Sequence, residues 1–328
     1  MNFAKVMNVL MAIGSVVAFP GASAEPAPGM HRIGYINVGP AGPNAPNVAA
    51  FRAGLAELGY VEGRNIAVEF RWGDGKSDRL PALVDELLAL KPEIIAAFGG
   101  AVTVRAVTAA TATVPIVFIT GDPVAEKIVP NMARPGGNAT GFAVLAGELE
   151  PKRLELLQQM LPRVKRIAVV WNPTQPYVEG IYRSTEEAAS RLGMTLLPWQ
   201  ARNVAELEQA FVQIAGAKAD ALFILADPVL GLERARIVEF ANRNRLPGIY
   251  FFREFADIGG LASYGTSLTA VHRRAAHYVD QILKGAKPGD LPIQQPTTFE
   301  LILNLKTAKA LGIAIPQTVR QRADEVIE

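Results

Sequence analysis

The 328-residue chain contains no cysteine. A protein of this length can fold on its hydrophobic core alone, so the absence of disulfides does not prevent export. A bacterial lipoprotein needs a cysteine at its cleavage point to carry the lipid. The chain is therefore excluded from that class of anchored proteins.

Signatures of catalysis are also missing. There are only three histidines. His272 and His277 lie on one predicted helix about 140° apart, so they do not share a face. The chain has no phosphate loop, no GxGxxG after a strand, no GxSxG elbow, no HExxH and no Cys/His cluster. We predict that the protein is not an enzyme and needs no cofactor or metal.

Charge of one sign is not in excess. The chain has 33 Lys+Arg and 31 Asp+Glu, and no basic block stands out, so nucleic acid is not an expected partner. Beyond the N-terminus no apolar stretch reaches the length that spans a bilayer, so we expect no stable membrane anchor.

The N-terminal segment 1–24 has the features of an export signal. Lys5 precedes an apolar run from Val6 to Phe19, which is shorter than the ~20 residues of a spanning helix. Pro20 and Gly21 end the run, and Ala-Ser-Ala at 22–24 is an A-x-A cleavage site. An uncleaved membrane anchor is the alternative. Together with the missing cysteine, the signal predicts a free protein in a Gram-negative periplasm, cleaved near Ala24.

The rest of the chain alternates short apolar strands with amphipathic helices. RIGYINV at 32–38 is typical of a buried strand, and apolar residues spaced by three and four over 48–58 predict a helix. Four such units occupy about 90 residues, and the pattern restarts near residue 151. Strands separated by helices favour a parallel sheet covered on both faces. The predicted fold class is α/β, with two doubly wound parallel-sheet lobes.

The glycine-rich stretches divide these units. We predict that 133–148 and 259–265 cross between the lobes, and that the helix 269–283 returns to the first. Two or three crossings would give a hinged clamshell whose cleft binds a small ligand. The expected division is a signal peptide at 1–24, lobe 1 at 31–142 plus about 268–298, lobe 2 at 143–264, and a C-terminal segment at 299–328 that the sequence assigns to neither lobe.

Ligands of open α/β sheets bind beyond the carboxyl ends of the strands. In the first lobe this rule selects eight residues. The glycine turn before the helix at 102–112 suits a ligand carboxylate, although an ordinary turn is an equal alternative. The candidates are Asn44, Asn47, Gly99, Gly100, Ala101, Thr120, Asp122 and Pro123.

The second lobe contributes six candidates. Asp227 is the best partner for a ligand ammonium, with a helix N-cap as the alternative role. The tyrosines offer stacking surface or serve as buried structural residues, and the glutamate at 254 binds ligand or pairs with Arg253. The candidates are Asn172, Tyr177, Asp227, Tyr250, Glu254 and Tyr264.

Several motifs, in order, resemble one family. They are FRAGL at 51–55, LGYVEGRN at 58–65, GDPV at 121–124, ARPGGN at 133–138, WNP at 171–173, GLASYG at 260–265, YVDQILKGAKP at 278–288 and NLKTAKALG at 304–312. The chain is similar to substrate-binding components of ABC importers with the type I periplasmic-binding-protein fold, in the branch that includes tryptophan- and tyrosine-type binding proteins. The resemblance covers about 32–328.

The resemblance implies a monomeric Venus-flytrap receptor. It would capture a small solute and deliver it to an ABC permease in the inner membrane. An amino acid or related organic acid is the expected ligand, and an aromatic one is favoured by the resemblance alone. A sensor of the same fold, coupled to a chemoreceptor or kinase, remains an alternative. A periplasmic enzyme is less favoured, and a cytosolic repressor would need a DNA-binding segment where the export signal stands.

Overall fold

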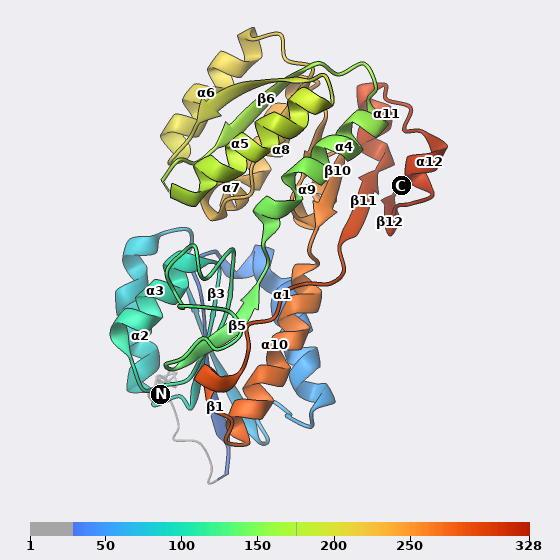
Figure 1. Cartoon of the computed structure of the whole chain (residues 1–328). Coiled ribbons are helices and arrows are strands. Elements are labelled where there is room, and N and C mark those ends of the chain that lie inside the picture. Colours follow the sequence, from blue (N-terminus) through green and yellow to red (C-terminus); the bar gives the residue numbers. More distant parts are fainter. Residues whose placement is uncertain (1–28, 175) are drawn as a thin grey trace, which may run out of the picture.

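The computed structural model describes residues 29–174 and 176–328. The predicted export signal lies outside the described residues. Two α/β lobes, each built on one sheet, are joined end to end (Figure 1). Among the described residues, no helix combines the length and the apolar character that crossing a bilayer requires.

Lobe 1 is a five-stranded parallel sheet with its helices. The strand order is β2 (Ile66–Trp72), β1 (His31–Asn37), β3 (Ile94–Phe98), β4 (Ile116–Thr120) and β5 (Ala139–Ala143). The central strands β3 and β4 are buried along their whole length and apolar except for Thr120 at the end of β4, as expected of a covered parallel sheet. One face packs α1 (Ala41–Glu57) and α10 (Leu268–Leu283), and the other packs α2 (Leu80–Ala89) and α3 (Ala101–Ala110).

Lobe 2 is a seven-stranded sheet with helices on both faces. All its strand pairs are parallel except β10 with β11. The order is β12 (Glu325–Ile327), β11 (Glu300–Asn304), β10 (Ala262–Gly265), β9 (Gly248–Tyr250), β8 (Ala221–Ile224), β6 (Arg166–Trp171) and β7 (Thr195–Gln200). One face packs α4 (Glu150–Met160), α5 (Pro176–Arg191), α11 (Leu305–Leu311) and α12 (Gln317–Arg320). The other packs α6 (Val204–Gly216), α7 (Pro228–Leu232), α8 (Arg234–Arg243) and α9 (Arg253–Asp257).

The predicted fold class is confirmed, but only the end of the first glycine-rich stretch, 144–148, belongs to a crossing, and the second stretch belongs to none. Each contains a strand, β5 in 133–148 and β10 in 259–265. A Cβ on Gly141 would lie 2.0 Å from the Phe118 carbonyl oxygen, and a Cβ on Gly265 would lie 2.0 Å from that of Phe251. These glycines allow neighbouring backbones to approach closely, and they do not mark a linker.

The actual crossings between the lobes are shorter. The first is 144–149, which contains the 3-10 turn Ala146–Leu149, and the second is 266–267. The third is 295–299, because Ile293 still packs in the core of lobe 1 and β11 begins at Glu300. Between β8 and β9 the chain forms two helices, α7 and α8, with Glu233 between them.

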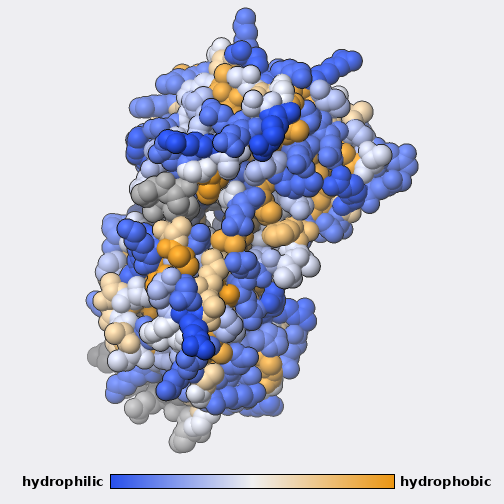
Figure 2. All heavy atoms as spheres, in the orientation of Figure 1, coloured by the Kyte–Doolittle hydropathy of each residue, from blue (hydrophilic) through white to orange (hydrophobic). Residues whose placement is uncertain are grey.

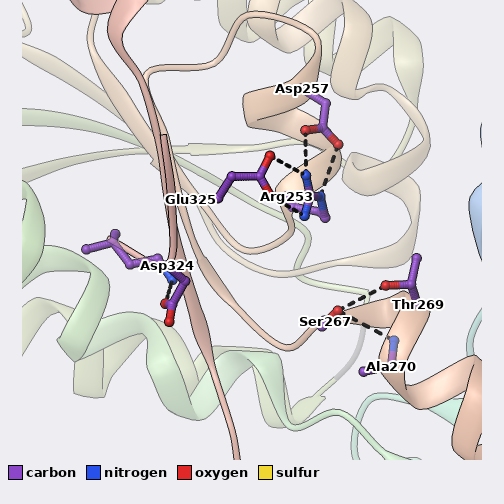
Figure 3. Close-up of polar contacts among 8 residues, drawn as sticks. Arg253, Asp257, Ser267, Thr269, Ala270, Asp324 and Glu325 are labelled. Carbon is purple, nitrogen blue, oxygen red and sulfur yellow. Dashed lines mark hydrogen bonds and ion pairs between the residues drawn. The ribbon is translucent and has the colours of Figure 1, made fainter. Parts of the chain in front are cut away.

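The C-terminal segment, which the sequence left unassigned, belongs to the sheet of lobe 2. β11 pairs with β10 and β12 pairs with β11. Arg253 at the start of α9 binds Glu325 of β12, with Nη1 and Oε2 3.0 Å apart, and also Asp257 (Figure 3). The end of the chain therefore holds α9 in place.

Candidate functional site

A cleft of about 880 Å³ lies between the lobes, beyond the carboxyl ends of β1, β3 and β4 on one side and of β8 and β9 on the other. This volume lies in the usual range of small-molecule sites, roughly 300–1,000 Å³. Hydrophobic residues gather at the waist where the lobes meet, on the face shown in Figure 2. The apolar residues that line the cleft include Val38, Pro43, Ile119, Val144, Leu145, Ile181, Leu232, Phe251, Phe252 and Leu268.

The lobes touch at one side of this cleft. A Cβ on Gly100 of lobe 1 would lie 3.2 Å from Cγ of Pro228 in lobe 2, and one on Gly39 would lie 3.3 Å from Cδ2 of Leu232. Leu232 also packs against the apolar core of lobe 1. The short helix α7 thus spans the gap between the two sheets.

Eight of the fourteen candidate residues line the cleft: Asn44, Asn47, Gly99, Gly100, Thr120, Asp122, Asp227 and Glu254. Five lie off its described lining: Ala101, Pro123, Asn172, Tyr250 and Tyr264. The side chain of Tyr177 lies outside the described part of the chain.

The two described tyrosines are structural in this arrangement. Tyr250 is 1 % exposed and stacks on Phe255, with ring centroids 4.7 Å apart. Burial raises its pKa well above the ordinary value. Tyr264 packs toward Phe299, with centroids 6.2 Å apart. Their places in β9 and β10 direct them to the faces of the sheet and away from its edge, so a rule that follows chain order alone placed them wrongly.

Asp227 lines the cleft and has the capping role considered for it. Oδ1 accepts hydrogen bonds from the backbone N–H groups of Val229 (2.8 Å) and Leu230 (3.0 Å), so the residue is the N-cap of α7. Oδ2 accepts one from Nδ2 of Asn172, 3.2 Å away, which places Asn172 behind the site as a support. Burial raises the pKa of Asp227, and these hydrogen bonds act in the opposite direction.

Glu254 is the second acid of lobe 2 that lines the cleft. Its expected alternative partner, Arg253, binds Asp257 and Glu325 instead (Figure 3). Within the described chain, Oε2 of Glu254 is buried and has no hydrogen-bond partner. Burial raises its pKa, and the charge of Arg234, which also lines the cleft, partly offsets this effect.

The polar groups of lobe 1 are mostly engaged with their own chain. Thr120 Oγ1 donates to Oε2 of Glu126 at 2.5 Å, and Asp122 Oδ1 accepts from the N–H groups of Val124 and Ala125 at 3.0 Å each. Asn44 Nδ2 donates to the carbonyl of Pro40 at 2.8 Å.

The glycine turn before α3 is fixed by its close neighbours. Gly99 and Gly100 have φ of +99° and +89°, and a Cβ on Gly99 would lie 2.6 Å from Asn37 Oδ1. This leaves the turn as bare backbone at the N-terminus of α3, where a helix favours negative charge.

His272 is a cleft residue that the strand-end rule missed. It lies near the start of α10, which enters lobe 1 from the second crossing and so follows no strand of the lobe 1 sheet. Nδ1 lies 2.7 Å from the Leu268 carbonyl, and Nε2 is buried without a partner among the described residues. Burial lowers its pKa to about 4, so the ring is neutral at pH 7. Its odd place on an apolar helix face was the available signal.

A buried ion pair holds the crossings together behind the cleft. Arg153 and Glu150 are both fully buried, with Nη2 and Oε1 2.6 Å apart. Arg153 also donates to the carbonyls of Ala146 in the first crossing (2.8 Å) and of Tyr264 before the second (3.0 Å). Glu150 accepts from the N–H of Ala226 at 2.8 Å, next to Asp227. Burial raises the pKa of Glu150, opposed by the neighbouring guanidinium.

Two sheets, three crossings and an interlobe cleft define a two-lobed binding protein of the type I periplasmic class. Residues 44–327 match the family described as ABC transporter substrate binding protein, and the chain belongs to that family. The fold and family expected from the sequence motifs are thereby confirmed.

Individual relatives agree with this assignment. A tyrosine-binding protein of Clostridioides difficile is 25% identical over 264 residues, which are 80% of this chain and 75% of that protein. The crystal structure of a conserved domain protein from Vibrio cholerae is 27% identical, with a TM-score of 0.82 over 90% of this chain and 99% of that one. An ABC domain from Streptococcus pneumonia, solved with L-Trp, is 22% identical, with a TM-score of 0.81 over 91% and 100%.

Proposed function

We propose that the protein captures an amino acid with an aromatic side chain in the interlobe cleft and delivers it to the permease of an ABC importer. Membership of this family supports the delivery step, and the predicted export signal supports a periplasmic setting. A curated relative is named for tyrosine and a structural neighbour holds L-Trp, which supports the aromatic class.

The observation that carries the proposal is the presence of charged groups from both lobes beside apolar walls in one cleft. Asp227 and Glu254 of lobe 2 offer carboxylates to a ligand ammonium. The glycine turn at the N-terminus of α3 in lobe 1, or the guanidinium of Arg234, offers a place for a ligand carboxylate. The apolar walls between them suit a hydrophobic side chain.

A thermal-shift screen of the exported protein tests the proposal. The panel contains the twenty amino acids, aromatic acids lacking the amine, and sugars. A ligand present at 100 times its Kd stabilises the folded state by about 2.7 kcal/mol, so an aromatic amino acid should raise the Tm by several degrees. Titration calorimetry should then give one site per chain. A response to sugars alone would overturn the proposed ligand class.

Two further measurements test the setting and the delivery step. Mass spectrometry of the exported protein should show an N-terminus near Glu25. Deletion of the gene should reduce uptake of the radiolabelled ligand by intact cells. Unchanged uptake together with a lost chemotactic or transcriptional response would favour the sensor alternative.

A further inference from the structure

Among the described residues, two that line the cleft from lobe 1 each contain a buried hydrogen-bond acceptor without a partner. The first is the His272 imidazole, which is 4 % exposed. A backbone carbonyl can only accept, so the 2.7 Å contact with Leu268 places the ring hydrogen on Nδ1. Nε2 then carries a lone pair, and no described group donates to it.

The second acceptor is the side-chain oxygen of Asn47 on α1. The residue is 5 % exposed and lines the cleft, and within the described chain Oδ1 has no hydrogen-bond partner. A buried acceptor without a donor is unusual in a folded protein and needs an explanation.

The packing of α1 against α10 brings these two acceptors to the same end of the helix pair. A Cβ on Gly54 would lie 2.9 Å from Cβ of Ala276, and the Tyr60 hydroxyl bonds Asp280, so the helices run side by side in the same direction (Figure 1). Counting back from Gly54 and Ala276, two helical turns reach Asn47 and one reaches His272.

The surroundings of His272 are apolar and aromatic. The ring meets Phe98 edge-on, with centroids 4.8 Å apart. Leu268, Phe252 and Val144 line the cleft and pack on the same core cluster of lobe 1. In such an environment a hydrogen bond is stronger than in water, and an unmade one is more costly.

These observations indicate that the cleft receives two kinds of hydrogen-bond donor from a ligand, one charged and one neutral. An ammonium is drawn to the carboxylates of Asp227 and Glu254, because charge-assisted hydrogen bonds are stronger than neutral ones. A neutral imidazole nitrogen and an amide oxygen on an apolar wall suit a neutral N–H or O–H carried by the body of the ligand.

We propose that His272 and Asn47 make the cleft selective for ligands whose aromatic side chain carries a hydrogen-bond donor, such as an indole N–H or a phenol O–H. This inference rests on the proposed function and adds the feature that distinguishes one aromatic ligand from another. Sites built to receive a donor reject analogues that lack it, because the buried acceptor is then left unpaired.

Titration calorimetry with two ligand pairs tests this selectivity. L-tryptophan is compared with 3-benzothienyl-L-alanine, in which sulfur replaces the N–H, and L-tyrosine with L-phenylalanine. In at least one pair, we expect the donor-bearing member to bind at least tenfold more tightly to the wild type. In His272→Leu the ratio should fall toward one through loss of affinity for that member, and Asn47→Leu should reduce it less.

Control variants distinguish selectivity from damage. His277 lies on the exposed side of the same helix, so His277→Leu should leave the affinity ratio unchanged. If His272→Leu does not fold, His272→Gln, which restores an acceptor, should fold and retain preference for the donor-bearing member.

The outcomes separate the two proposals. Equal affinities within both pairs in the wild type would overturn the selectivity and leave the aromatic ligand class standing. A ratio that survives in both His272→Leu and Asn47→Leu would also overturn it. No binding of any of the four ligands, alongside binding of another solute class, would overturn the proposed function and this inference with it.

Discussion

The buried polar groups at the crossings and those in the cleft differ in how fully they are paired. The Glu150–Arg153 pair is fully buried, and its charged groups bind each other and three backbone groups. In the cleft, atoms of His272, Asn47 and Glu254 are buried without a partner in the described chain. Both sets lose their hydrogen bonds to water on folding, but only the first set replaces them with hydrogen bonds inside the protein.

This difference separates structural polarity from binding polarity. A satisfied network fixes the geometry of the elements it joins, here the crossings and the loop that carries Asp227. Unsatisfied atoms cost stability in the free protein, and that cost is returned only when something else supplies the partner. The contrast predicts that changes at the crossings reduce stability most, whereas changes in the cleft mainly alter binding.

The largest expected effect is at the buried pair. Arg153→Met leaves the Glu150 carboxylate buried and unpaired, so we expect a loss of about 3–5 kcal/mol in the free energy of unfolding. Urea denaturation measures it. Glu150→Gln combined with Arg153→Met should lose less than Arg153→Met alone, and an equal or greater loss in the double variant would contradict the pairing argument.

The next effect is the dependence of stability on pH at His272. The folded pKa is about 4, below the ordinary value of 6.5, so the unfolded state binds the extra proton between these values. Stability from this group is therefore complete above pH 6.5 and falls as the pH drops. Relative to His272→Gln, the wild type should lose about 2–3 kcal/mol between pH 7 and pH 4.5.

Denaturation curves at the two pH values measure this difference. His277→Gln, on the exposed side of the same helix, should match the wild type at both. A pH-independent difference for His272→Gln would mean that the imidazole has the same pKa in the folded and unfolded states, which would contradict a pKa lowered by burial.

A smaller effect is expected at Asp227. Asp227→Ala should weaken binding of an amine-bearing ligand at least tenfold, which is about 1.4 kcal/mol, and should cost about 1 kcal/mol of stability through loss of the cap. Asn203→Ala removes the N-cap of α6, whose side chain accepts from the N–H of Glu206 (3.0 Å). It should show the same loss of stability with unchanged affinity by calorimetry. If Asp227→Ala bound the ligand as tightly as Asn203→Ala and the wild type do, Asp227 would have a capping role only.

The smallest effect concerns the half-exposed ion pair near the third crossing (Figure 3). Glu325→Gln breaks its contact with Arg253, which keeps Asp257. Because solvent screens such pairs, stability should change by less than about 1 kcal/mol in urea denaturation. A loss comparable to that of Arg153→Met would remove the distinction between buried and exposed pairs.

The candidate site was predicted unevenly from the sequence. The strand-end rule found Asp227 and the Gly99–Gly100 turn because a parallel strand fixes where the next residues emerge. It also selected Tyr250 and Tyr264, which lie within β9 and β10 and not beyond the ends of these strands. It missed His272, which reaches the cleft on a helix and not from a strand end.

The sequence by itself determined the two α/β lobes, since hydrophobic periodicity reports which face of each element is buried. The order of the sequence motifs indicated the family. The tertiary structure alone decided that the C-terminal strands join lobe 2, that Glu150 and Arg153 pair beneath the crossings, and that His272 and Asn47 face the cleft together. Glu150 and Arg153 are only three residues apart, but their burial depends on contacts with Ala226 and Tyr264 in other segments. The other two features depend on how separate strands pair and how one helix lies against another, and no local pattern records such packing.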